Sequence, residues 1–259
     1  MKVPVGFTAH GSPMNALGGT PFADALERWA PALLAGARAL LVVSAHWETR
    51  GVALTGAAAP DTIHDFGGFP EPLYRLRYPA PGHPGLAVEA VELLAGAGVE
   101  ARVDPERGID HGAWSPLRFL RPSADRPVVQ LSLDRTRSLA ELIDVGRALH
   151  PLRERGVLVL GSGNVVHNLR TADFADRDAP VEGWARDFDA WVKARLLDWD
   201  LPMLAAPEDG PSGRVAHPTR EHYAPLLVAA GAAGPGSRVS FPWEGFEHGT
   251  ISMRCVQFG

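Results

Sequence analysis

The stretch Leu40–His46, with the sequence LLVVSAH, decides the fold class, because a short apolar run leads directly into a histidine. A second run, Val5–Ala9 (VGFTA), ends in the same way at His10. A third run, Val157–Leu160, leads through a glycine-rich turn toward His167. Apolar runs of this length, bounded by turn residues, are typical of strands that are buried on both faces of a parallel sheet. The pattern therefore predicts three buried strands that each lead to a histidine.

Helix-like segments alternate with strand-like runs along the rest of the chain, which favours an α/β fold. Helices are predicted around 22–33, 85–94, 142–152 and 184–191, and further strands at 99–103, 128–133, 238–241 and 250–258. Pro31 is expected to kink or shorten the first helix. The last two strands are expected to form an antiparallel edge. Since no repeat or linker interrupts the pattern, we expect one α/β domain over residues 1–259, with a central, mostly parallel sheet flanked by helices.

Composition excludes several classes of function. The formal net charge of −5 is spread without a basic run, so no nucleic-acid partner is expected. No apolar stretch reaches the length of a membrane span, and the first residues lack the pattern of a signal peptide, so we expect a cytoplasmic protein. The single cysteine, Cys255, rules out a disulfide framework within the chain and a cysteine-based zinc site. The turn Gly161–Gly163 matches neither a dinucleotide fingerprint nor a phosphate-binding loop.

Histidines that follow buried strands are the main functional signal. Loops at the carboxyl ends of parallel strands converge on one crevice, so His10, His46 and His167 are expected to meet there. His222 lies in a similar loop-rich segment, where His217 is an equally placed competitor. Neutral imidazole is the commonest metal-ligating side chain. The sequence therefore predicts a metalloenzyme.

Other histidines have weaker contexts. His111 follows Asp110 in a loop, and an imidazole with a pKa near neutrality suits proton transfer, so we predict a catalytic role for it. His64 is a weaker candidate, whereas His83, His150 and His248 are expected to face solvent. The Pro- and Gly-rich segment 205–213 is predicted to be a long surface loop that covers the site.

Seven motifs, in order along almost the whole chain, resemble those of the DODA-type extradiol dioxygenases, the 4,5-DOPA dioxygenase-like members of the LigB superfamily. The motifs are Ala9–Asn15, Ser44–Trp47, Thr62–Pro70, Tyr78–Gly82, Asp110–Gly112, Gly163–Leu169 and Glu221–Tyr223. The resemblance implies a LigB-like α/β domain that uses O2 to open the ring of a catechol and gives a semialdehyde. The family name suggests 4,5 cleavage of DOPA-like rings.

The resemblance also implies a mononuclear metal and roles for individual residues. His10, His46 and His222 match the family's metal ligands, and His111 matches its acid/base histidine. His167 matches a position that is either a fourth ligand or an acid/base residue. Fe(II) is the metal expected for ring cleavage, although bacterial members can carry zinc. The usual non-haem iron site has two histidines and one carboxylate, whereas an all-histidine site also suits zinc.

Substrate contacts and alternative functions complete the expectations. Trp47, Tyr223 and His64 are predicted to bind the substrate, since aromatic rings near the motifs can stack on a catechol. The alternatives are a zinc-dependent hydrolase and a non-enzymatic metal-binding or interaction protein on the same fold. The sequence leaves the oligomeric state unknown.

Overall fold

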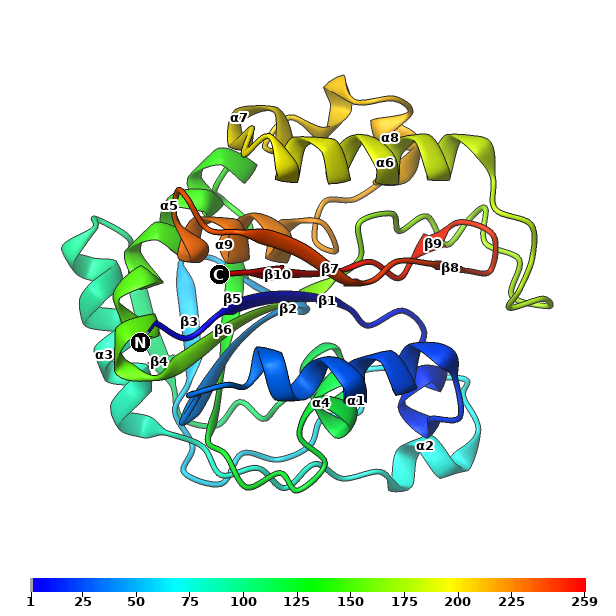
Figure 1. The fold of residues 1–259 in the computed structure, drawn as a ribbon. Helices are drawn as coiled ribbons and strands as arrows, with labels where there is room; N and C mark the ends of the chain where they lie inside the picture. Colours follow the sequence, from blue (N-terminus) through cyan, green and yellow to red (C-terminus); the bar gives the residue numbers. More distant parts are fainter. Residues whose placement is uncertain (1) are drawn as a thin grey trace.

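The computed structural model describes residues 2–259, and eight of the strands there form one sheet in the order β4-β3-β5-β2-β6-β1-β10-β7 (Figure 1). These strands are β1 (Val5–Ala9), β2 (Ala39–Thr49), β3 (Val52–Thr55), β4 (Ala101–Asp104), β5 (Val128–Asp134), β6 (Val157–Gly163), β7 (Val239–Trp243) and β10 (Cys255–Phe258). The four central strands, β5, β2, β6 and β1, are all parallel. The mostly parallel sheet is confirmed, and so is the antiparallel edge, which β7 and β10 form.

Helices cover both faces of the sheet. They are α1 (Pro21–Leu33), α2 (Glu71–Arg75), α3 (Pro84–Gly96), α4 (His111–Leu120), α5 (Leu139–Leu149), α6 (Gly183–Leu197), α7 (Leu201–Leu204), α8 (Gly213–Ala216) and α9 (Ala224–Ala233). In Figure 1, α1 and α4 lie on one side of the sheet, and α5 and α9 lie on the other. A short hairpin of β8 (Phe246–Glu247) and β9 (Ile251–Ser252) extends beyond the sheet. Within residues 2–259, no helix is long and apolar enough to cross a membrane.

The central strands are apolar along their whole length because each face packs against helices. In β6, Val157 and Val159 join the core beneath α5 and α9, whereas Leu158 and Leu160 join the core beneath α1 and α4. Adjacent residues of a strand point to opposite faces, so a strand covered on both faces needs no polar alternation. This burial explains the continuous apolar runs that precede the histidines.

Several boundaries differ from the sequence-based expectation. Strand β2 continues past His46 to Thr49, through an irregularity in its pairing with β5 between Val43 and Glu48. The predicted strand 250–258 is divided into β9 and β10. Pro31 lies inside α1 without breaking it, and the helix ends two residues later. Because Pro31 is so near the end, few helical hydrogen bonds remain to be disrupted.

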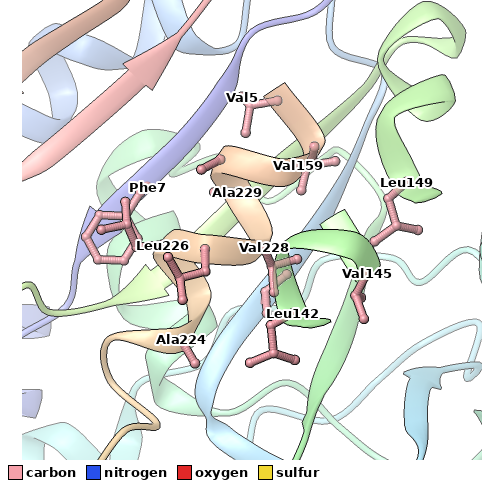
Figure 2. Close-up of a cluster of buried hydrophobic side chains, with 14 of the residues drawn as sticks. Val5, Phe7, Leu142, Val145, Leu149, Val159, Ala224, Leu226, Val228 and Ala229 are labelled. Atoms are coloured by element: carbon pink, nitrogen blue, oxygen red, sulfur yellow. The ribbon is translucent and has the colours of Figure 1, made fainter. Parts of the chain in front are cut away.

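Helix α9 was not predicted, because it has no polar face. All ten of its residues are buried, and Figure 2 shows it between α5 and the strands β1 and β6. Leu226 and Val228 of α9 lie among Phe7, Val159 and Leu142 in that view. A helix buried on every side lacks the periodic pattern that identifies surface helices.

The close packing of α9 on β6 requires glycine in the strand. A Cβ atom at Gly161 would lie 2.4 Å from the carbonyl oxygen of Pro225, in the first turn of α9. A Cβ atom at Gly163 would lie 2.0 Å from the carbonyl oxygen of His222, just before the helix. Since backbone atoms cannot move aside as a flexible side chain can, these two glycines determine how near the His222 turn lies to the sheet.

Replacing Gly161 by alanine is expected to lower the free energy of unfolding by about 2–3 kcal/mol, because the added methyl group forces α9 away from the sheet. Gly96→Ala is the matched control. Gly96 ends α3, and a methyl group added there would meet nothing within 4 Å, so alanine is expected to stabilise the fold by about 0.5 kcal/mol. Urea denaturation of both variants measures the difference, and equal stabilities would contradict the packing argument.

Candidate metal centre

Three histidines from distant parts of the chain meet at the carboxyl ends of the central strands. His10 follows β1, His46 lies in β2, and His222 lies in the turn before α9. One ring nitrogen of each lies within 4.8 Å of the others. The Nε2 atoms of His10 and His46 are 3.0 Å apart. The expected convergence of these three histidines is therefore present.

Strand β6 brings the first two histidines together, because it lies between β1 and β2. Ser162 pairs with Thr8 on one side and with Ser44 on the other. The Ser162 hydroxyl donates to the carbonyl oxygen of Gly112, so it can only accept from Nδ1 of His10, 3.0 Å away. This hydrogen bond places the proton of His10 on Nδ1 and leaves the Nε2 lone pair directed at His46.

The other two histidines also have an oxygen acceptor beside Nδ1. Glu221 Oε1 lies 3.0 Å from Nδ1 of His222, and Asp65 Oδ2 lies 3.6 Å from Nδ1 of His46. Metal-binding histidines generally donate their second nitrogen in this way, which fixes the tautomer and the ring orientation. The Nε2 atoms of His10 and His222 are thus available as ligands, and Nε2 of His46 faces that of His10.

Burial keeps these imidazoles neutral. Desolvation lowers the pKa of His10 and of His222 well below the usual value, and neighbouring histidines lower both further. The pKa of His46 is lowered to about 4, also mainly by burial.

The spacing of the ring nitrogens also suits a metal ion. Two nitrogens held about 2.1 Å from one metal at a right angle would lie about 3.0 Å apart, which is the separation of the two Nε2 atoms of His10 and His46. His10 and His46 therefore fit a divalent metal ion, and His222 offers a third nitrogen within 4.8 Å of theirs.

His111 lies beside this group as the first residue of α4. Its ring centroid is 4.0 Å from that of His46, and its Nδ1 lies 3.0 Å from Asp65 Oδ1, which also accepts from the His111 backbone N–H. Burial alone would raise the pKa of Asp65, but the contacts with His111 outweigh it and lower the pKa to about 2. Asp65 therefore stays ionised and contacts two histidines of the site.

His167 stands next to the three histidines without joining their group. Its ring stacks on that of His222 at a centroid separation of 3.5 Å and an angle of 11°. His167 could hold a metal ion together with Glu221 and His222, but it is not part of the group formed by His10, His46 and His222. Burial lowers the pKa of His167 to about 4, so its ring is neutral at pH 7.

A cavity of about 320 Å³ opens over the histidines and is called the inner cavity below. His46, His111, His167 and His222 line one side of it. Large apolar side chains also line it, those of Phe66, Phe69, Leu169, Phe174 and Ile251. A cavity of this size with an apolar wall and a few polar groups is typical of small-molecule sites.

The structure places the predicted substrate-binding residues elsewhere. His64 lies behind Phe66, with Nε2 3.0 Å from the carbonyl oxygen of Leu76. Trp47 is buried beneath the guanidinium of Arg107. Tyr223 is fully buried and donates to Leu204. None of the three lines the inner cavity.

Two other expectations about the surroundings of the site need correction. The segment 205–213 borders a different cavity, with Tyr223 and His217, and does not cover the histidines. His248, expected to face solvent, lines the inner cavity because the β8–β9 hairpin folds over it.

Asp65 and His248 are the residues of the site that sequence reasoning missed. Asp65 follows His64 within the Thr62–Pro70 motif, so the motif indicates the right segment, but Asp65 and not His64 lines the inner cavity. Nothing near His248 in the sequence indicated a fold-back of the hairpin.

Comparison with known proteins agrees with this geometry. Residues 5–258 match the family described as "Catalytic LigB subunit of aromatic ring-opening dioxygenase". The chain is 43% identical to a protein of Escherichia coli (strain K12) named "4,5-DOPA dioxygenase extradiol", with 100% of this chain and 95% of that protein covered. It is 39% identical to a protein of the same name from Beta vulgaris, with 97% and 95% covered.

A solved structure extends the likeness to three dimensions. The crystal structure of an uncharacterized protein from Escherichia coli K12 matches with a TM-score of 0.86 and 38% identity, and all of both chains is covered. The match over nearly the whole sequence and the shared fold lead to one conclusion: this chain belongs to the LigB family of aromatic ring-opening dioxygenases.

Proposed function

We propose that this chain is an Fe(II)-dependent extradiol dioxygenase that cleaves DOPA-like catechols next to their two hydroxyl groups. The observation that carries the proposal is the group of three neutral histidines, His10, His46 and His222, of which His46 and His222 line a cavity of about 320 Å³. The names of the relatives support ring cleavage over hydrolysis or a non-enzymatic role.

His10, His46 and His222 would hold the metal through their Nε2 atoms. Bound Fe(II) would supply a redox-active centre with open positions for the catechol oxygens and for O2, which zinc cannot do because it does not change oxidation state. The protein contributes the neutral ligands. It also contributes two hydrogen-bond acceptors, Ser162 and Glu221, which orient His10 and His222.

His111 is proposed to accept a proton from the catechol. Asp65 acts as its positioning residue, because the carboxylate beside Nδ1 favours a proton there and stabilises the imidazolium once Nε2 takes up a second proton. His167 is proposed as a second acid/base group rather than a fourth ligand, since it stacks on His222 and stands outside the group of three.

The apolar side of the inner cavity is proposed to hold the ring. Phe66 and Phe69 come from the same motif as Asp65, so the segment that positions the base also forms the wall against which a ring packs. Aromatic side chains prefer offset or edge-on contact with a ring, and they exclude water from it. This arrangement would hold the catechol hydroxyls toward His111 and the histidine group.

Anaerobic reconstitution with Fe(II) or Zn(II) tests the proposal as a whole. We expect O2 uptake and a yellow semialdehyde product from L-DOPA with the iron form, and neither with the zinc form. An oxygen electrode and absorbance spectra measure both. Activity that needs zinc and no O2 would establish the hydrolase alternative, and metal binding without turnover of any catechol would favour the non-enzymatic one.

His10→Ala is expected to abolish stoichiometric metal binding, because it removes one of three ligands and leaves a partly formed site. His64→Ala is the matched control, since His64 lies near the same cavity wall without lining the cavity. Metal content after dialysis, measured by elemental analysis, separates the two. Full metal content in the His10 variant would overturn the ligand assignment.

His111→Gln is expected to keep its metal but to lose roughly 10²–10⁴-fold in kcat, the range for loss of a general acid or base. Metal content and steady-state kinetics on the same preparation check both statements. A kcat within twofold of the unaltered enzyme would remove His111 from the proton-transfer role.

A further inference from the structure

A second cavity adjoins the inner one and is not needed to hold an aromatic ring. It has a volume of about 540 Å³ and is called the outer cavity here. Ser12, Phe69, Phe174 and His248 line both cavities, so the two cavities adjoin at these residues. A ring at the metal centre whose side chain extends toward these shared residues would bring that side chain to the outer cavity.

The outer cavity contains an ion pair, whereas the inner one has a largely apolar wall. Arg177 pairs with Glu247 of strand β8, and Arg177 also donates to the side-chain oxygen of Asn15. The amide of Asn15 donates in turn to Glu247 Oε2 at 2.9 Å. The side chain of Glu247 is only 8% exposed, while that of Arg177 is 37% exposed. One positive and one negative group thus border the same space in fixed positions.

Backbone contacts hold the segments that carry these charges. The backbone N–H of His248 donates to the carbonyl oxygen of Arg177 at 2.7 Å, and Nδ1 of His248 lies 3.0 Å from the carbonyl oxygen of Asp173. His248 itself has a φ of 55°, a left-handed conformation that non-glycine residues adopt at an energetic cost. The hairpin is therefore fixed to the loop that carries Arg177, and both border the cavity.

We propose that Arg177 and Glu247 bind the amino-acid head group of a catechol substrate, the carboxylate at Arg177 and the ammonium at Glu247. This inference rests on the proposed ring-cleaving function and specifies the substrate class. A zwitterion complements both members of the ion pair. A side chain with a carboxylate alone would also meet Glu247, and one with an amine alone would also meet Arg177, so each lacks one favourable contact.

The test compares four catechols with similar side-chain lengths in the iron-loaded enzyme. They are L-DOPA, 3,4-dihydroxyphenylpropionate, dopamine and 4-ethylcatechol, which carry both charges, the carboxylate, the ammonium and neither. Arg177→Met is expected to lower the kcat/KM ratio of L-DOPA to 4-ethylcatechol roughly tenfold, the value of one charge-assisted hydrogen bond. The ratio of kcat/KM for dopamine to that for 4-ethylcatechol should change far less.

Glu247→Gln should instead affect the catechols that carry an amine. Its kcat/KM for L-DOPA and dopamine should fall relative to that for the two catechols without an amine. Arg177→Lys keeps the charge and should retain most of the preference for carboxylates. Arg186→Met is the matched control, because Arg186 is an exposed residue of α6 that lines neither cavity. It removes one positive charge and should leave all four ratios unchanged.

Calorimetric binding of the same four catechols to the zinc-loaded protein without O2 gives a second measurement that does not depend on turnover. A uniform loss for all four in the Arg177 and Glu247 variants, in kinetics and in binding, would mean that the ion pair is only structural and would overturn the proposal. Charge-dependent binding without cleavage of any catechol by the iron form would support the head-group site and refute the proposed function instead.

Discussion

The metal centre depends on how closely strand β6 packs against its neighbours on both faces. On one face, Gly161 and Gly163 let the first turn of α9 and the His222 turn lie against the strand backbone. Between them, Ser162 points the other way and accepts from His10. Because successive residues of a strand point to opposite faces, Gly161 and Gly163 allow the close packing on one face, while Ser162 forms its hydrogen bond on the other. The glycine-rich turn, which resembles no nucleotide-binding motif, therefore has a packing role.

The chemistry of the site follows from acceptors placed behind the histidines. Ser162 and Glu221 lie within 3.0 Å of the Nδ1 atoms of His10 and His222, so the opposite nitrogens face the metal position. Asp65 extends this arrangement, because its two oxygens approach His46 and His111 separately. One carboxylate consequently links a metal ligand to the proposed base. A change at Asp65 would disturb metal binding and proton transfer together, although Asp65 itself is in neither role.

The sequence predicts the parts of the structure that leave a local pattern. Apolar runs indicate β1, β2 and β6, and the convergence of His10 and His46 follows from the general rule for parallel strands. His222 reaches the same place from the turn before α9, which that rule does not cover. Helix α9 leaves no such pattern, since it is buried on every side. Its identification required knowledge of what packs around it.

The side chains around the histidines could be predicted less well, because tertiary packing decides where they point. Trp47 and Tyr223 adjoin site residues in sequence, yet neighbours along a strand or a turn point in different directions, and both rings are buried elsewhere. Asp65 and His248 enter the site through a loop and a hairpin whose positions depend on long-range contacts. The motifs indicate most of the histidines that line the cavity, but in the Thr62–Pro70 motif they do not show that Asp65 rather than His64 faces it.

The proposed ligands His10, His46 and His222 are far apart along the chain, and this separation links metal uptake to folding. An unfolded chain would have to close very long loops to bring the three nitrogens together, at a large cost in conformational entropy. A metal ion should therefore bind the native protein far more tightly than any partly folded form, and so shift the folding equilibrium toward the native state by mass action. In a cell where the metal is scarce, the abundance of this protein would then follow the metal supply, because chains without metal would be exposed to proteases for longer.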